Sequence, residues 1–209
     1  MRIGIFGGTF NPIHYGHLRA AEEVRERLEL AKVIFVPSYL PAHKELAAAI
    51  PGTKRLQTVR LAIQDNPHFE VSSFEVDAGG KSYSIRTIEQ VREQYQTTPY
   101  FILGQDSFNE IMTWHAAPKH FDISHFAVMS RPGASWLPLT DILGDLSNTF
   151  KKTDKGFRNK GGCEIISIDV TPFDISSSAI RALCREGRTI KYLVPPEVEA
   201  YIIAERMYS

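Results

Sequence analysis

Short apolar runs alternate with amphipathic stretches along most of this chain. Largely apolar runs occupy residues 3–6, 33–36, 100–103, 125–129 and 164–168. Between several of them, apolar residues recur every three or four positions, at about 18–30, 54–64 and 84–95. Continuous apolar runs are typical of strands buried on both faces, and the amphipathic spacing is typical of helices that cover such strands. The pattern predicts an α/β protein with a doubly wound, mostly parallel sheet and helices on both faces.

Two regions depart from this alternation. Residues 69–71 and 74–76 are short, strand-like pieces that we expect near an edge of the sheet. Residues 145–162 carry many charges and glycines and few apolar side chains, which predicts a long, exposed and mobile loop. We predict one domain over residues 1–209, with a C-terminal helical part from about residue 176.

Composition narrows the classes of partner. Lys plus Arg and Asp plus Glu each number 24, so the formal net charge is zero and gives no general attraction for nucleic acids or anionic membranes. No apolar run approaches the roughly 18 residues of a membrane span. Cys163 and Cys184 form no CxxC motif, and Arg2 leads straight into the first strand without a signal peptide. We therefore expect a cytoplasmic protein with neither nucleic-acid nor membrane partners, while a homo-oligomer is left open.

The most distinctive stretch is GGTFNPIHYGH at residues 7–17, between the first apolar run and the first helix. A glycine turn that opens a helix directs backbone N–H groups at an anion. His14 and His17, three residues apart, fall on one face of the first helical turn. Any one of these features alone is explained by a tight turn and a helix start. Together they predict a phosphate site.

The stretch resembles the HxGH signature of the nucleotidyltransferase superfamily. The resemblance implies a Rossmann-like fold in which a nucleoside triphosphate lies over the first strand and the histidines hold its phosphates. Asn11 stands where members commonly carry aspartate, and it keeps an acceptor without the charge. We leave Asn11 out of the catalytic set.

A second motif opens a later helix, at Asp174 to Arg181. Three serines, Ser176, Ser177 and Ser178, offer one cap and further donors, and Arg181 lies one turn into the helix. The segment is similar to the superfamily's ISSTxIR motif, which implies contacts to the triphosphate. The resemblance implies a catalytic set of His14, His17 and Arg181, which stabilise developing charge. It also implies ATP-binding residues Gly7, Gly8, Thr9, Phe10, Gly104, Asp106, Arg131, Ile175, Ser176, Ser177 and Ser178.

Other segments are similar to nicotinate-nucleotide adenylyltransferases in particular. Lys44 in the segment PAHK, the segment SYSIRT from Ser82 to Thr87, the segment GQD from Gly104, and Trp114 stand at matching positions. From the residues alone, the more common explanations are an exposed loop lysine for Lys44, a helix cap for Ser82 or Ser84 and a core position for Trp114. For Asp106, an N-cap and a ligand contact are equally supported. The resemblance implies substrate-binding residues Lys44, Ser82, Tyr83, Ser84, Thr87 and Trp114.

The matches run from residue 3 to about 206 and imply transfer of the adenylyl group of ATP to nicotinate mononucleotide, giving deamido-NAD and pyrophosphate in NAD biosynthesis. We expect Mg²⁺ to be carried mainly by the ATP phosphates, with no metal ion held by the protein alone. The alternatives are pantetheine-phosphate adenylyltransferase and a non-catalytic nucleotide-sensing domain of the same fold. The absence of GxxxxGK[ST] and of GxGxxG disfavours a P-loop enzyme and an NAD-dependent dehydrogenase. The preference between nicotinate and nicotinamide mononucleotide stays open.

Overall fold

A computed structural model describes residues 1–41, 50–130 and 136–208. Its main feature is an eight-stranded sheet with the order β4-β2-β1-β6-β7-β10-β9-β8. The strands are β1 Ile3–Gly8, β2 Lys32–Pro37, β4 Phe69–Val71, β6 Tyr100–Gly104, β7 His125–Ser130, β8 Phe150–Thr153, β9 Gly156–Asn159 and β10 Glu164–Asp169. The six strands from β4 to β10 in this order are parallel, and β9 and β8 continue the sheet as an antiparallel hairpin. The predicted Rossmann-like, mostly parallel α/β fold is confirmed.

The chain reverses its direction of growth across the sheet at β1. It first builds outward through β2 and β4, and then returns to place β6 on the other side of β1. In such sheets, ligands bind at the carboxyl ends of the strands where this reversal occurs. The ends of β1 and β6 therefore define where a site is expected.

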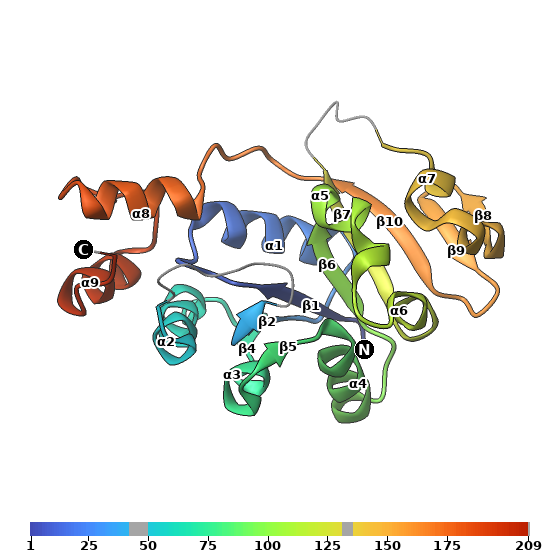
Figure 1. The fold of residues 1–209 in the computed structure, drawn as a ribbon, viewed down its shortest axis with the longest axis horizontal. Helices are drawn as coiled ribbons and strands as arrows, with labels where there is room; N and C mark the ends of the chain where they lie inside the picture. Colours follow the sequence, from blue (N-terminus) through green and yellow to red (C-terminus); the bar gives the residue numbers. More distant parts are fainter. Residues whose placement is uncertain (42–49, 131–135, 209) are drawn as a thin grey trace.

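Helices pack on both faces of the sheet and extend beyond it at one end (Figure 1). One buried cluster joins the sheet to the helices α1 Tyr15–Arg27, α2 Gly52–Ile63, α8 Ser177–Arg185 and α9 Pro196–Ala204. The other joins it to α4 Ser84–Tyr95, α5 Gln105–Asn109, η1 Ile111–Thr113, α6 Ala117–Ile123 and α7 Leu139–Leu143. The remaining elements are α3 Phe74–Ala78, η2 Gly144–Thr149 and the short parallel pair β3 Leu40–Pro41 and β5 Lys81–Ser82. No helix in these described ranges is long and apolar enough to cross a membrane.

Two sequence-based predictions of local structure were wrong. Residues 74–76 lie in the helix α3, where the Asp77 N–H donates to the Ser73 carbonyl at 2.8 Å and Val76 is buried one turn along. Residues 150–159 form the β8–β9 hairpin instead of an irregular loop. Gly156 lets the hairpin join the sheet, because its φ is 144° and a Cβ there would lie 2.1 Å from the carbonyl oxygen of Ile165 in β10.

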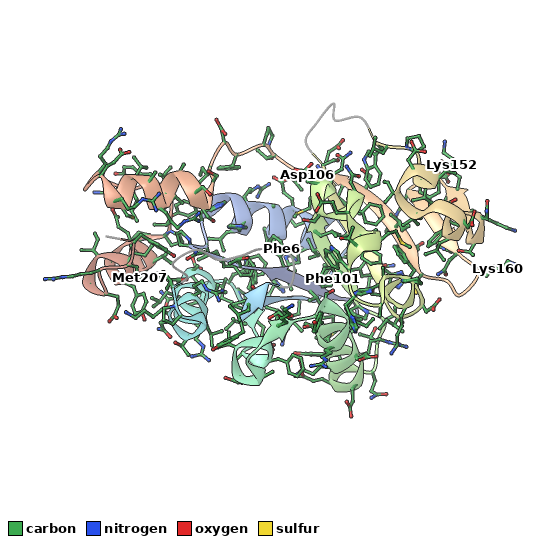
Figure 2. All side chains as sticks on the ribbon, in the orientation of Figure 1. Phe6, Phe101, Asp106, Lys152, Lys160 and Met207 are labelled. Carbon is green, nitrogen blue, oxygen red and sulfur yellow. The ribbon has the colours of Figure 1, made fainter. Side chains whose placement is uncertain are left out.

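The hairpin was obscured in the sequence because its strands bury little. Phe150 and Phe157 pack against the second buried cluster, while the lysines between them stay exposed. Figure 2 shows Lys152 and Lys160 at the end of the molecule opposite Met207. The hairpin therefore extends the sheet away from the carboxyl ends of β1 and β6.

Candidate active site

The first helix begins at two adjoining histidine rings. Gly7 and Gly8 continue β1, so the turn falls at residues 9–13 and α1 starts at Tyr15, with His14 as its N-cap. The backbone N–H of His14 donates to Nδ1 of His17 at 3.3 Å, and the two ring centroids lie 3.7 Å apart. Because Nδ1 of His17 accepts this bond, its neutral ring carries the proton on Nε2. Nε2–H of His17 is thus fixed as a hydrogen-bond donor.

Burial keeps both rings neutral. It lowers the pKa of His14 to about 4 and the pKa of His17 to about 3, and the proximity of His14 lowers the pKa of His17 further. At pH 7 these side chains therefore act as hydrogen-bonding groups, and an adjoining phosphate would raise both pKa values. This refines the sequence-based expectation that they stabilise charge.

Gly16 explains the glycine of the HxGH spacing. A Cβ at this position would lie 3.1 Å from Nδ1 of His14 and 3.5 Å from Cβ of Phe173. The first contact is tighter than most side chains tolerate, so a larger residue would displace the His14 ring. Glycine leaves the space in which the two rings meet over the first turn of α1.

The second motif is joined directly to the first by two hydrogen bonds, and a third lies within it. Ser177 Oγ donates to the Pro12 carbonyl at 2.8 Å. Arg181 donates through Nη1 to the Asn11 carbonyl at 2.8 Å and through Nη2 to Ser178 Oγ at 3.0 Å. Ser176 is the N-cap of α8 and accepts from the Ala179 N–H at 3.2 Å. The structure thus brings the N-termini of α1 and α8 together and gives each serine a different role.

Arg55 is a buried residue of this region that the sequence reasoning missed. Its side chain is 1% exposed, and its guanidinium donates to the carbonyls of Thr9 at 2.6 Å, Ser38 at 2.6 Å and Tyr39 at 2.9 Å. It also donates to the carbonyl of Ile50 at 3.1 Å. Burial lowers its pKa. Arg55 therefore ties the loop after β1 to the segment after β2, and its place among the apolar positions of α2 was the only signal in the sequence.

A cavity of about 280 Å³ opens at the carboxyl ends of β1 and β6. Residues from both parts of the predicted site line it, namely Gly7, Gly8, Thr9, Gly104, Ser82, Tyr83, Ser84 and Trp114. The Trp114 ring packs edge-on to Phe101, with the centroids 5.8 Å apart, and Figure 2 shows Phe6 and Phe101 in the middle of the sheet below. The cavity wall therefore combines aromatic residues with glycines, and Phe6 of this wall also meets the His17 ring, with the centroids 6.2 Å apart.

The N-terminus of α4 faces this cavity without a side-chain cap. Tyr83 is the N-cap and caps no N–H. Ser82 Oγ instead accepts from the Tyr39 N–H at 2.9 Å, and Ser84 Oγ lies 2.8 Å from Nε2 of His120. The alternative that a serine caps this helix was therefore wrong. Helix N-termini carry N–H donors and a partial positive charge that suit a carboxylate.

Glu75 places a carboxyl group at the wall of the same cavity. Thr87 Oγ1 donates to Glu75, and burial raises the pKa of this carboxyl. Thr87 itself is 1% exposed and is absent from the cavity lining. The Thr87 side chain therefore holds Glu75, and the substrate contact of Thr87 that the resemblance implies stays a prediction.

Comparison with known proteins decides the family. A cytidylyltransferase-like family model matches residues 5–183. A Geotalea daltonii protein named "Probable nicotinate-nucleotide adenylyltransferase" is 46% identical over 100% of this chain and 99% of its own length. A protein of the same name from Syntrophotalea carbinolica is 42% identical over 100% of this chain and 97% of its own. This chain belongs to the nicotinate-nucleotide adenylyltransferase family.

Solved structures agree on the fold of this family member. The structure of Plasmodium falciparum nicotinic acid mononucleotide adenylyltransferase complexed with NaAD has a TM-score of 0.72 and 18% identity, covering 99% of this chain and 97% of its own. The same protein complexed with APC has a TM-score of 0.71 and 17% identity, covering 99% and 96%.

The remaining sites implied by the family resemblance fall in different places. Gly104 ends β6 and lines the cavity, whereas Asp106 is exposed in the first turn of α5, whose N-cap is Gly104 (Figure 2). Phe10 is buried and packs against the His17 ring at 5.3 Å between centroids, so it supports the histidine from below. Ile175 is half-buried just before α8. Lys44 and Arg131 lie outside the described residues.

The described residues hold no group of three or more His, Cys, Asp or Glu side chains that could bind a metal ion. The donors at the two helix ends are imidazole, hydroxyl and guanidinium groups, whereas Mg²⁺ prefers carboxylate, phosphate and water oxygens. The residues present thus suit a magnesium ion that arrives on phosphates. That the ion is carried by ATP stays a prediction.

Proposed function

We propose that this enzyme transfers the adenylyl group of ATP to nicotinate mononucleotide, giving deamido-NAD and pyrophosphate. The proposal rests on one observation above the others. The cavity that holds Tyr83 and Trp114 also has Gly7, Gly8 and Thr9 in its wall, and these residues lead directly to His14 and His17. A pyridine nucleotide in the cavity would therefore bring its phosphate to the place where the two helix N-termini converge.

The triphosphate side consists of α1 and α8. Nε2–H of His17, the N-terminus of α8 and the guanidinium of Arg181 are donors for phosphate oxygens. The ATP substrate is its magnesium complex, and magnesium would neutralise part of the charge on the leaving pyrophosphate.

The acceptor side consists of the aromatic wall and the N-terminus of α4. Trp114 offers a flat face for a pyridinium ring, and a cationic ring gains from an aromatic partner. We expect the first N–H groups of α4, which no side chain caps, to bind the carboxylate on that ring. The carboxylate on the ring is thus recognised by the helix end, and Ser84 lies beside it in the cavity wall.

The chemistry needs no general base from the protein. The nucleophile is the phosphate of the mononucleotide, which is ionised at neutral pH. The enzyme must align this oxygen in line with the α-phosphorus. It must also stabilise the charge that develops on the oxygen between the α- and β-phosphorus of ATP, which leaves with pyrophosphate. The neutral His17 ring, which donates through Nε2–H from a fixed position, supplies part of this stabilisation without reorganisation.

The test is pyrophosphate release from Mg-ATP with separate acceptors. We expect release with nicotinate mononucleotide and formation of deamido-NAD in equal amount. Release with phosphopantetheine alone would assign the alternative adenylyltransferase. Nucleotide binding without release from any acceptor would assign the sensing domain.

A further inference from the structure

His120 is a buried histidine that reaches the cavity wall from behind. It lies on α6 and its side chain is fully buried. Nε2 lies 2.8 Å from Ser84 Oγ, and Nδ1 lies 3.2 Å from the carbonyl oxygen of Ala116. The edge of the ring also meets the Trp114 ring, with the centroids 5.9 Å apart. His120 therefore contacts two residues of the cavity wall without lining the cavity.

The two hydrogen bonds determine where the protons are. A carbonyl oxygen only accepts, so Nδ1 of His120 must carry a proton. In the neutral ring Nε2 is then a bare acceptor, and the single proton of the Ser84 hydroxyl must point to it. Ser84 Oγ is left with lone pairs only. A ligand in the cavity would meet it as an acceptor.

Protonation of His120 reverses this role. Nε2–H of the charged ring donates to Ser84 Oγ, and the hydroxyl proton becomes available to the cavity. A carboxylate accepts hydrogen bonds and cannot donate them, whereas a carboxamide donates through its NH₂ group. An acceptor at Ser84 therefore suits an amide substituent, and a donor suits a carboxylate.

We propose that His120 is a positioning residue that sets the donor or acceptor role of Ser84 and thereby the choice between an acid and an amide substituent on the pyridine ring. The inference rests on the proposed function, since it concerns the acceptor nucleotide of that reaction. It gives α6, which lies outside the segments that resemble the family motifs, a role in substrate specificity.

The surroundings of His120 keep it neutral at pH 7. Burial lowers its pKa, and the nearby His115 acts in the same direction. The backbone carbonyls and the carboxylate of Glu89 on α4 oppose this shift, and Glu89 is paired with Lys119. Arg86 of α4 lies over the Tyr83 ring, and Glu75 borders the cavity. As the pH falls, His120 gains a proton and the site should turn towards the carboxylate.

The experiment compares kcat/KM for nicotinate mononucleotide and nicotinamide mononucleotide between about pH 5.5 and 8.5 by pyrophosphate release. The phosphate groups of the two substrates titrate alike, and a carboxylate stays ionised over this range. A change with pH in the ratio of the two kcat/KM values therefore reports titration of a group on the protein. In the wild type we expect the acid-to-amide ratio to rise as the pH falls. His120→Gln can accept from Ser84 and donate to Ala116 without titrating. The acid-to-amide ratio of the His120→Gln variant should equal the wild-type ratio at neutral pH over the whole pH range.

Two further variants separate positioning from structural support. His120→Leu removes the acceptor and frees the Ser84 proton, so the ratio at pH 7.5 should rise about fivefold or more. Ser84→Ala removes the switchable group, and the pH dependence of the ratio should disappear. His125→Gln is a matched control, because His125 is also held neutral by burial but stacks on Tyr100 and donates nothing to the cavity. It should keep the wild-type pH dependence.

Several results would overturn the inference. One is a ratio that does not change with pH in the wild type. Another is an equal loss of kcat/KM for both substrates in the His120 variants, which would give the residue only a structural role. A pH dependence lost in His115→Gln and kept in His120→Gln would assign the titration to His115. Failure of pyrophosphate release with both mononucleotides is a separate outcome, because it removes the proposed function itself. His120→Gln keeps the test open if His120→Leu does not fold.

Discussion

Arg181 donates to the backbone carbonyl of Asn11 at 2.8 Å, across 170 residues of sequence. This contact ties the N-terminal end of α8 to the loop that precedes the two histidines. The Asn11 side chain is engaged as well, since its Oδ1 accepts from the Tyr208 hydroxyl at 2.8 Å. The loop is therefore fixed by α8 and by the segment that follows α9, which gives the proposed phosphate-binding turn a defined geometry.

The first prediction concerns Arg181. Arg181→Ala should lower kcat/KM by about a hundredfold, because a guanidinium near the phosphates and the tie to Asn11 are lost together. Arg181→Lys should recover only a small part, since an ammonium cannot bond the carbonyl and a phosphate with the same geometry. Steady-state pyrophosphate release measures both. Arg185→Ala is the control, because Arg185 is exposed in the last turn of α8, and its activity should match the wild type.

The second prediction concerns His17. His17→Ala should lower kcat by roughly a hundredfold or more with a smaller change in KM, because Nε2–H is a donor fixed for the transition state. His17→Asn, which keeps an N–H donor, should lose less. An unchanged kcat with a raised KM for ATP would contradict this assignment and give His17 a role in ground-state binding.

The third prediction is a pH dependence of stability. The folded-state pKa values of about 4 for His14 and about 3 for His17 lie below the unfolded value of roughly 6.5. The unfolded chain therefore binds more protons between these values, and the free energy of unfolding should fall as the pH drops from about 6.5 towards 4. Urea unfolding at pH 7.5 and 5 measures this change. The double variant His14→Asn, His17→Asn should lose less stability over that interval, and an identical loss would place the titration elsewhere.

The fourth prediction concerns Arg55. Arg55→Met leaves the carbonyls of Thr9, Ser38 and Tyr39 buried without a donor, which should lower the free energy of unfolding by about 3 kcal/mol or more. The loops on both sides of the cavity lose their tie, so KM should rise for both substrates. Urea unfolding and steady-state kinetics measure the two effects. Arg60→Ala, an exposed change on the same helix, should leave both near the wild type.

The strands and the two phosphate motifs were predictable from local sequence. β2, β6 and β7 are buried on both faces, so continuous apolar runs mark them, and the histidine and serine motifs lie at helix starts that short-range patterns reveal. The β8–β9 hairpin was not predicted from the sequence, because its half-exposed strands carry lysines and an arginine. No strong apolar pattern was there to be found.

The residues that support the candidate site were not predicted either, and the reason is different. Arg55 bonds to backbone carbonyls, which have no sequence signature, and His120 bonds to a serine 36 positions away. Such contacts exist only once the sheet has placed α4, α6 and the loops side by side. Local sequence patterns thus identified the candidate ligand-binding residues. The residues that support them, Arg55 and His120, were identified only from the folded structure.

The central claim is that this protein joins ATP to nicotinate mononucleotide. The most direct measurement follows both products, pyrophosphate and deamido-NAD, after the purified chain is mixed with Mg-ATP and nicotinate mononucleotide. The account predicts equal amounts of the two products from the wild type and a loss of both in His17→Ala. Neither product from the folded wild-type protein, or products undiminished in His17→Ala, would contradict it.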